Sequence, residues 1–432
     1  MVFLTIDIDD PVLLWVVYGC AVIAFLYLLL RRPFARWLIP SLVALAAGSL
    51  LGLLVTWSVD ALESFGPPMA PETRVWIVGA FAGIALAAVN LWRSGALRRI
   101  VAIISAVLIA ATAGLGINAY FGLNPDLGSL FGINIDRPID LPTKIQTTDA
   151  DGRPLWETWQ DPGGLPATGR VGTVHIPASQ SGFDARDAEV YLPPAALAAD
   201  PPNLPFVLMM MGQPGNPDAH PIGDVLDRFA AEHDGLAPIV LVVDQLGDPS
   251  IDPLCLDTIQ FGNALTYLRT DAVGWATQNL NISANRTDWT VAGYSNGGQC
   301  AISLAARDPE VWGNVIDIAG VEYPGSENAD EVLSDVFHGD QAAYDREKPV
   351  NILADHDYPD TVAIFTAGSD DDAFGPGVKI VSEAAAAAGM AVTYFEVPNG
   401  GHTIVALDGG LNGAFDVLYP RLGLTQGEEQ SR

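Results

Sequence analysis

One serine in a glycine-rich turn has the clearest potential for chemistry in this 432-residue chain. The segment Gly293-Tyr-Ser-Asn-Gly297 has the spacing G-x-S-x-G, follows a short apolar run at 289–292 and precedes an apolar stretch at 299–306. A strand, a sharp turn and a helix in this order lift a serine hydroxyl above the end of a sheet. The pattern predicts Ser295 as a nucleophile, with the N–H of Asn296 donating to developing negative charge. The alternative is a glycine-rich turn with an incidental serine.

A serine hydroxyl is a weak nucleophile unless a base removes its proton, and one histidine has a suitable position. His402 follows Asn399-Gly-Gly and the predicted strand 392–397, and it precedes a predicted helix. The other five histidines lie in predicted strand, helix, surface or loop positions: His175, His220, His233, His338 and His356. The sequence therefore predicts His402 as the general base.

The acid that orients the base should follow the preceding strand, at 361–366. Three adjacent carboxylates do so, and the spacing G-x-x-D from Gly368 favours Asp371. Asp370 and Asp372 are alternatives, and any of the three could instead be a solvated loop carboxylate or a helix cap. The loop lacks the ligand spacing of an EF-hand, so the sequence predicts no metal ion and no cofactor.

A second donor to the oxyanion should come from the loop after the predicted buried strand 205–211. That loop has the sequence Gly212-Gln-Pro-Gly-Asn216. Pro214 has no N–H, so Gln213 is the candidate donor. A glycine–proline turn without a catalytic role is the alternative.

The elements that must position these residues alternate between strands and helices. An antiparallel pair is predicted at 171–177 and 188–193, and further strands at 205–211, 237–243, 289–292, 315–319, 361–366 and 392–397. Helices are predicted at 223–232, 258–280 and 378–388 and after His402. This alternation predicts an α/β fold with a doubly wound, mostly parallel sheet.

The first 121 residues differ from the rest, because they contain four long apolar runs. The runs cover 11–30, 37–57, 74–92 and 100–121. Each is close to the roughly 20 residues that cross a bilayer. Buried helices of a soluble protein are the alternative, but these runs leave nothing polar to cover them. The acidic segment before the first run argues against a cleaved signal peptide, so the sequence predicts a four-span anchor.

Arginines predict the orientation of this anchor. They follow the first and third runs, at Arg31, Arg32, Arg36, Arg93, Arg98 and Arg99, whereas the opposite flanks contain mostly Asp and Glu. By the positive-inside rule, the arginine-rich loops face the cytoplasm. Both termini, and everything after residue 121, would then lie outside it. The predicted location is the cell membrane, with an extracytoplasmic catalytic domain.

Charge and segment composition limit the partners and divide the chain. The formal net charge is −30, and the acidic excess lies after residue 120. Such a surface repels phosphates, which argues against binding to nucleic acid.

The predicted organisation is an anchor at 1–121, a linker at 122–168, an α/β domain at 169–424 and a disordered tail at 425–432. The sequence predicts no oligomeric state.

Three cysteines are too few for a disulfide framework. Cys20 lies inside the first apolar run, and Cys255 and Cys300 lie in the predicted α/β domain. These two could pair if that domain is outside the cell. Equally, both could be small buried thiols.

The region 170–424 resembles the esterase branch of the α/β-hydrolases, which includes actinobacterial mycolyltransferases, feruloyl esterases and S-formylglutathione hydrolases. The resemblance rests on Ser181–Pro194, Gly212-Gln213, Leu265-Thr-Tyr-Leu268 ahead of Trp275, Gly293–Gly298 and Gly400-Gly-His402. Four spans before such a domain are similar to membrane-anchored esterases of actinobacterial envelopes. The oxyanion turn departs from the commoner His-Gly or Asp-Gly form, and no Trp closely follows His402, where mycolyltransferases often have one.

The resemblance implies a membrane-tethered serine esterase that acts on a small-molecule ester or an envelope lipid. An acyltransferase that moves acyl chains to envelope sugars is the main alternative, since it shares the same first half-reaction. A peptidase and a catalytically inactive envelope binding module are further alternatives.

Overall fold

The computed structural model describes residues 3–8, 10–62, 69–122, 124–131, 133, 135–144 and 153–427. The chain divides into two compact units, Met1–Ile135 and Asp136–Arg432, and each is described here by itself. The predicted disordered tail lies outside the described residues from 428 onward.

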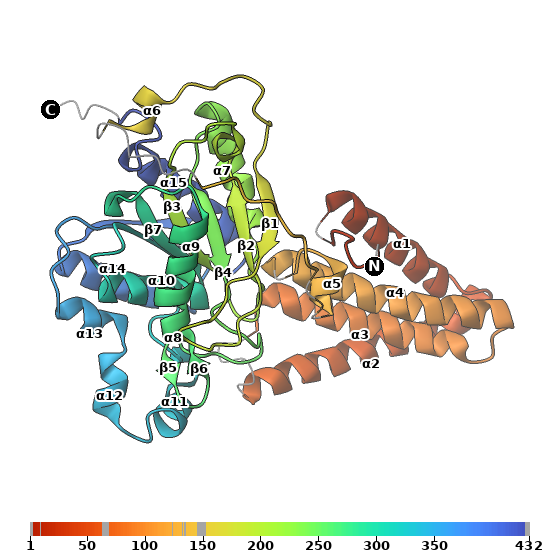
Figure 1. The fold of residues 1–432 in the computed structure, drawn as a ribbon. Coiled ribbons are helices and arrows are strands. Elements are labelled where there is room, and N and C mark those ends of the chain that lie inside the picture. Colours follow the sequence, from red (N-terminus) through yellow and green to blue (C-terminus); the bar gives the residue numbers. More distant parts are fainter. Residues whose placement is uncertain are drawn as a thin grey trace. The chain divides into compact units, whose positions relative to one another are not determined.

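The N-terminal unit contains four long helices, at the four apolar runs of the sequence. They are α1 (Pro11–Leu29), α2 (Phe34–Ala61), α3 (Pro71–Leu91) and α4 (Ala96–Phe121), followed by the short α5 (Leu127–Leu130) (Figure 1). All four long helices are long and apolar enough to cross a membrane. Many of their large hydrophobic side chains are exposed, as expected for a surface that contacts lipid.

Small residues and buried polar groups hold these helices together. A Cβ at Gly48 of α2 would lie 2.4 Å from the carbonyl oxygen of Phe81 in α3, so the two backbones approach closely. The side chain of Asn90 donates to the carbonyl oxygens of Leu86 (2.8 Å) and Leu28 (3.3 Å). The guanidinium of Arg98 donates to Asn90 Oδ1 (2.8 Å) and to Leu28 O (3.0 Å). These bonds occupy a carbonyl at the end of α1 that its own helix leaves free.

The C-terminal unit is built on an eight-stranded sheet with the order β1-β2-β4-β3-β7-β8-β9-β10. Its strands are β1 (Arg170–Val174), β2 (Ala188–Leu192), β3 (Phe206–Met210), β4 (Ile239–Val243), β7 (Trp289–Tyr294), β8 (Asn314–Ile318), β9 (Val362–Gly368) and β10 (Ala391–Val397). The β1–β2 and β2–β4 pairs are antiparallel, and all the other pairs are parallel. The predicted mostly parallel α/β sheet is therefore confirmed.

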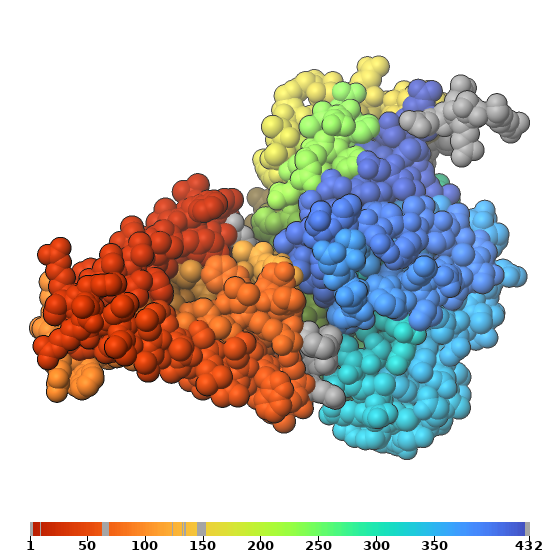
Figure 2. Space-filling view, turned by 180° about the vertical axis from the view of Figure 1, so that it is seen from behind, coloured from red at the N-terminus to blue at the C-terminus, as the bar shows by residue number. Residues whose placement is uncertain are grey.

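Helices cover both faces of this sheet. The helices of this unit are α6 (Leu155–Thr158), α7 (His220–Glu232), α8 (Ala264–Thr266), α9 (Val273–Asn279), α10 (Asn296–Arg307), α11 (Ala329–Asp335), α12 (Gln341–Arg346), α13 (Pro349–Ala354), α14 (Gly375–Ala387) and α15 (Ile404–Arg421). Helix α15 packs on α7, whereas α13 packs on α10 and α14. Segments late in the chain, coloured blue, form much of the face in Figure 2. Strands β3, β4, β7 and β8 are buried along their whole length, as parallel strands between two helical layers should be.

The predicted long helix at 258–280 is wrong in its first part. The chain instead forms the small strands β5 (Asp257–Thr258) and β6 (Gly262–Asn263), and Gly262 turns it with φ of +85°. The side chain of Asp257 accepts hydrogen bonds from the N–H and hydroxyl of Thr266, which favours a helix start close to Thr266. The helical path also contains a π-helical stretch, Tyr267–Ala272. The short helices α11 to α13 were not predicted, because six or seven residues give little periodic signal.

Candidate active site

Ser295 lies at the sharp turn between β7 and α10, in a backbone conformation that non-glycine residues rarely adopt. Its φ is 56° and its ψ is −120°. A Cβ at Gly293 would lie 1.9 Å from the carbonyl oxygen of Gly297, and a Cβ at Gly297 would lie 2.2 Å from that of Met210. The two glycines of the motif are therefore required by close backbone approach. Strain of this kind concentrates at functional sites, where surrounding structure maintains it.

The structure brings Ser295, His402 and Asp371 into one hydrogen-bonded chain. Ser295 Oγ lies 2.7 Å from His402 Nε2, and His402 Nδ1 lies 2.8 Å from Asp371 Oδ2. A carboxylate beside Nδ1 favours the tautomer with a proton on Nδ1, which leaves Nε2 free to accept the serine proton. Asp371 is buried, and its other oxygen accepts the N–H of Phe374 at 3.1 Å.

Of the three adjacent aspartates, Asp371 is the one that bonds His402. Asp370 and Asp372 are exposed. The N–H of Asp370 donates to the carbonyl oxygen of Gly400 (2.7 Å), which holds the acidic loop against the histidine loop.

Two aromatic rings flank the imidazole of His402. The Tyr294 ring stacks on it with centroids 5.3 Å apart, and the Phe374 ring lies at 4.2 Å. The histidine side chain is 23% exposed, so one edge of it remains open to a substrate. The rings restrict rotation of the imidazole, which helps to keep Nε2 directed at Ser295.

The two predicted oxyanion segments both lie beside Ser295. Asn296 is the first residue of α10. A Cβ at Gly212 would lie 3.1 Å from the Cβ of Ser295, so the loop after β3 passes directly against the nucleophile. Gln213 follows in this loop, and a cis peptide bond joins it to Pro214. The use of the two N–H groups as oxyanion donors stays a prediction.

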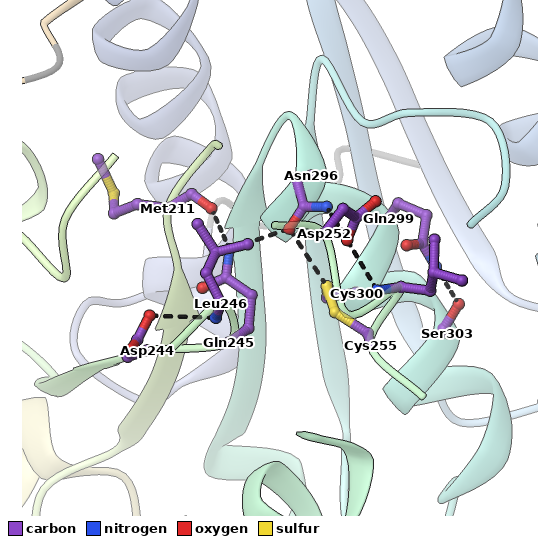
Figure 3. Close-up of a disulfide and its surroundings, with 11 residues drawn as sticks. Met211, Asp244, Gln245, Leu246, Asp252, Cys255, Asn296, Gln299, Cys300 and Ser303 are labelled. Atoms are coloured by element: carbon purple, nitrogen blue, oxygen red, sulfur yellow. Dashed lines mark hydrogen bonds between the residues drawn. A yellow bond between two sulfur atoms is a disulfide. The ribbon is translucent and has the colours of Figure 1, made fainter. Parts of the chain in front are cut away.

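A buried polar network, which was not predicted from the sequence, surrounds these segments. Gln245, just after β4, donates to the carbonyl oxygen of Met211 (2.5 Å) and to Asn296 Oδ1 (3.1 Å) (Figure 3). Asn296 Nδ2 in turn donates to Asp252 Oδ1 at 2.9 Å. Gln245 could have been recognised from its place in the sequence, because it follows a parallel strand and so lies at the same edge of the sheet as the other site residues.

Arg186 holds the oxyanion loop from its other side. Its guanidinium donates to both oxygens of the buried Asp244 (2.7 and 3.1 Å), to Asn216 Oδ1 (2.7 Å) and to the carbonyl oxygen of Gly215 (3.1 Å). A bidentate pair of this kind is rigid as well as strong. Arg186 therefore fixes the end of the Gly212–Asn216 turn, and Gln245 holds Met211 just before it.

Cys255 and Cys300 form a disulfide, which decides between the two alternatives left open by the sequence. It joins the loop after β4 to α10, five residues beyond the nucleophile (Figure 3). Leu254 and Cys255 both have positive φ, at 64° and 52°. The disulfide thus closes a loop whose backbone is itself strained.

The buried carboxyl group of Asp317 packs against the serine turn. Asp317 on β8 is paired in register with Gly293 of β7. A Cβ at Gly298 or Gly320 would lie within 2.5 Å of Asp317 Oδ1, so the turn packs tightly on this side chain. Burial raises the pKa of Asp317 to about 7, and its Oδ1 has no hydrogen-bond partner among the residues that the structure describes.

One group of metal-capable side chains lies close together among the described residues. Glu189, Asp218 and His220 present ligand atoms within 4.8 Å of one another. These atoms already bond the start of α7, because Asp218 accepts the N–H of His220 and Glu189 accepts that of Ala219, both at 2.9 Å. Burial and Asp218 raise the pKa of Glu189 to about 7, and the hydrogen bond to Asp218 raises that of His220 to about 9. A helix N-terminus disfavours a cation, so we interpret the group as a helix cap.

Comparison with known proteins identifies the family. Residues 179–403, more than half of the chain, match the family model described as Putative esterase. An uncharacterised protein of Corynebacterium glutamicum is 30% identical over 438 residues, which cover 97% of this chain and 98% of that protein.

The C-terminal part of the chain is also similar to solved structures, two of which have the following extent of similarity. A ferulic acid esterase is 16% identical with a TM-score of 0.49, covering 60% of this chain and 100% of its own. An S-formylglutathione hydrolase from Agrobacterium tumefaciens is 18% identical with a TM-score of 0.49, covering 60% and 98%. The identification rests on the family match, the sheet and the serine turn: the chain belongs to the Putative esterase family of α/β-hydrolases, with four long apolar helices ahead of the family domain.

Proposed function

We propose that this protein is a membrane-tethered serine esterase in which Ser295, His402 and Asp371 form the catalytic triad. The observation that carries the proposal is the hydrogen-bonded chain from the strained serine through the imidazole to the buried carboxylate, at 2.7 and 2.8 Å. Membership of an esterase family supports ester hydrolysis as the activity. Intact geometry for all three groups argues against an inactive binding module.

In the proposed reaction Ser295 Oγ attacks the carbonyl carbon of the ester, and His402 Nε2 takes the hydroxyl proton. The tetrahedral intermediate collapses as its bond to the alcohol oxygen breaks, and His402 donates the proton to the leaving alcohol. Water then attacks the acyl-enzyme with His402 again as base, the bond from the acyl carbon to Ser295 Oγ breaks, and His402 returns the proton to Ser295 as the carboxylic acid leaves. Asp371 stays ionised and stabilises the imidazolium through the Nδ1–H.

The N–H groups of Gln213 and Asn296 are the proposed donors to the oxyanion. Their segments lie beside Ser295, and the start of α10 places a helix N-terminus at the developing charge. Such donors act mainly in the transition state, because the negative charge forms only there.

The proposed location is the cell membrane, with the catalytic domain outside the cytoplasm. Four apolar helices, arginines after α1 and around the start of α4, and the Cys255–Cys300 disulfide all support it. Disulfides persist mainly in oxidising, extracytoplasmic compartments. Within this proposal residues 1–121 are the anchor, 122–168 the linker and 169–424 the catalytic domain.

The test uses the full chain purified in detergent, with p-nitrophenyl esters of increasing acyl length. Ser295→Ala should abolish hydrolysis, and Ser303→Ala, which changes a buried serine in the following helix α10, should retain it. A fluorophosphonate probe should label the wild type and not Ser295→Ala. A folded wild-type protein that neither turns over nor reacts with the probe would overturn the proposal.

A second arm separates hydrolysis from acyl transfer. Glycerol or trehalose is added as acceptor, and the free acid and acylated products are quantified. Formation of free acid regardless of the acceptor supports an esterase. Acyl-sugar formed at the expense of free acid would replace the esterase proposal with an acyltransferase, which shares the acyl-enzyme step.

A further inference from the structure

The side chain of Asn296 is held between two partners that allow one orientation of its amide. Asp252 Oδ1 accepts the N–H of Leu254 at 2.7 Å and the NH₂ of Asn296 at 2.9 Å, which places the amide nitrogen of Asn296 on this side. The oxygen of Asn296 therefore points the other way, toward Gln245 Nε2 at 3.1 Å. Gln245 has to be the donor in that bond.

Gln245 makes a second bond with the same nitrogen. Its Nε2 donates to the carbonyl oxygen of Met211 at 2.5 Å, two residues before Gln213. One amide group therefore connects the segment of one proposed oxyanion donor to the side chain of the other, as Figure 3 shows. Gln245 is 2% exposed, so bulk water does not replace these bonds.

The rest of the network is closed by packing and by a covalent bond. A Cβ at Gly297 would lie 2.2 Å from the carbonyl oxygen of Met210, so the end of β3 rests on the start of α10. The Cys255–Cys300 disulfide fastens the loop that contains Asp252 to α10. Hydrogen bonds thus connect the loop after β3, through Gln245 and Asn296, to the Asp252 loop that the disulfide joins to α10.

We infer that Gln245 is a positioning residue that sets the separation of the two oxyanion donors, the N–H groups of Gln213 and Asn296, by binding both of their segments at once. The inference rests on the proposed function. The donors stabilise the transition state more than the bound ester, so a looser arrangement lowers kcat and leaves KM nearly unchanged.

The experiment measures ester hydrolysis by full-length protein in detergent. Gln245→Met keeps the length of the side chain and removes both donated bonds. Its matched control is Gln299→Met, because Gln299 is a buried glutamine in α10 that bonds Ser303 Oγ at 2.8 Å, outside this network. We expect kcat to fall roughly 10- to 100-fold in Gln245→Met, with KM within about twofold, and both constants within about twofold in the control.

A second readout separates positioning from a general loss of structure. Phenylboronic acid forms a tetrahedral adduct with a reactive serine and mimics the transition state. Its affinity should fall by the same factor as kcat/KM in Gln245→Met. Asn296→Ala keeps the backbone N–H but removes the side chain that Gln245 holds. The double variant should therefore be little worse than the more damaging single one.

The outcomes distinguish the inference from the proposed function. Unchanged kcat in Gln245→Met, with an active wild type and an inactive Ser295→Ala, overturns the inference and leaves the esterase proposal intact. No Ser295-dependent turnover by the wild type overturns the proposed function. If Gln245→Met fails to fold, Asn296→Ala carries the test, and an unchanged kcat in that variant overturns the inference.

Discussion

Each compact unit contains a buried polar cluster in which a side-chain amide donates to a backbone carbonyl oxygen. The two clusters differ in what these hydrogen bonds achieve. In the N-terminal unit Asn90 and Arg98 donate to the carbonyl oxygen of Leu28, near the end of α1. In the C-terminal unit Gln245 donates to the carbonyl oxygen of Met211, just after β3. Both clusters satisfy carbonyl groups that regular secondary structure leaves without a partner.

The surroundings of the two clusters differ. The Asn90 cluster joins regular helices, whereas the Gln245 cluster lies beside strained backbone. Ser295, next to Asn296, and Leu254 and Cys255, next to the Asp252 contact, have positive φ, at 56°, 64° and 52°. Polar groups in the helical unit thus offset the cost of burying backbone carbonyls, and those in the sheet unit maintain a strained geometry. Loss of the first kind should lower stability, and loss of the second kind should mainly lower the reaction rate.

Ser295→Ala should cause the largest loss of reaction rate with the smallest change in stability. We expect kcat to fall by about 10⁶-fold, as is typical when a serine nucleophile is removed. The thermal midpoint should stay close to that of the wild type, because the methyl side chain fits the same turn. Hydrolysis assays and thermal melts on the same preparations check both, and residual turnover near the wild-type level would exclude Ser295 as nucleophile.

Asp371→Asn should give the next largest effect, a fall in kcat of about 10⁴-fold, because an amide favours the wrong tautomer of His402. Asp370→Asn and Asp372→Asn are the matched controls, since both aspartates are exposed. The controls should stay within about threefold of the wild type. A larger loss in either control than in Asp371→Asn would reassign the triad acid.

Removing the disulfide should mainly affect the stability of the C-terminal unit. The two cysteines are 45 residues apart, and a loop of that length predicts a loss of about 4 kcal/mol in the free energy of unfolding. Denaturant unfolding of Cys255→Ala/Cys300→Ala measures it, with wild-type protein in reductant as the parallel case. Equal denaturant midpoints with and without the disulfide would show that strain in the loop cancels the stability gained from cross-linking the unfolded chain.

The buried Asp317 should make stability depend on pH. Its pKa is raised by burial to about 7, whereas an aspartate in the unfolded chain loses its proton near pH 4. The stability contribution of this group is therefore present below about pH 4 and is lost as pH rises toward about 7. Asp317→Asn cannot ionise, so it should exceed the wild type in stability at pH 8 by roughly 2–4 kcal/mol and by much less at pH 5.

Melting curves at the two pH values check this, and Asp370→Asn is the exposed control. A difference between Asp317→Asn and wild type that does not grow with pH would mean that Asp317 does not titrate between them. Above about pH 7 Asp317 would then be a destabilising group packed against the serine turn.

Asn90→Leu should give the smallest effect. In contrast to Ser295→Ala, it should lower stability and leave the reaction rate unchanged. It removes bonds to Leu28, Leu86 and Arg98, and polar contacts between membrane helices contribute about 1 kcal/mol. We expect a lower thermal midpoint of the detergent-solubilised chain and an unchanged kcat. Ile103→Leu, at an exposed position of α4, is the control. A fall in kcat would break the proposed division between structural and site-directed polar groups.

Much of the architecture was predictable because its signals are local. The apolar runs predict α1 to α4, and alternation predicts most strands of the sheet. Ser295, His402 and Asp371 are recognisable because each follows a strand within a few residues, and parallel strands place such positions at one edge. The spacing from Gly368 favoured Asp371, the aspartate that bonds His402 in the structure.

The helix at 258–280 shows where local signals fail. The predicted helix includes residues that instead form β5 and β6, and strands of two residues are too short to carry a periodic pattern. The side chain of Asp257, whose bonds to Thr266 cap the helical stretch, carries no periodic pattern. The sequence likewise left undecided whether Cys255 and Cys300 pair, because pairing depends on distance in space and not on spacing in sequence.

The sequence by itself determined the strands of the main sheet, the four apolar segments and the serine turn, because periodicity and glycine requirements act over a few residues. Only the tertiary structure decided that Cys255 bonds Cys300 and that Gln245 connects Met211 to Asn296. These partners are 34 to 51 residues apart in sequence, and folding of the sheet brings them together. A hydrogen bond requires a separation of about 3 Å, and no local pattern encodes that distance.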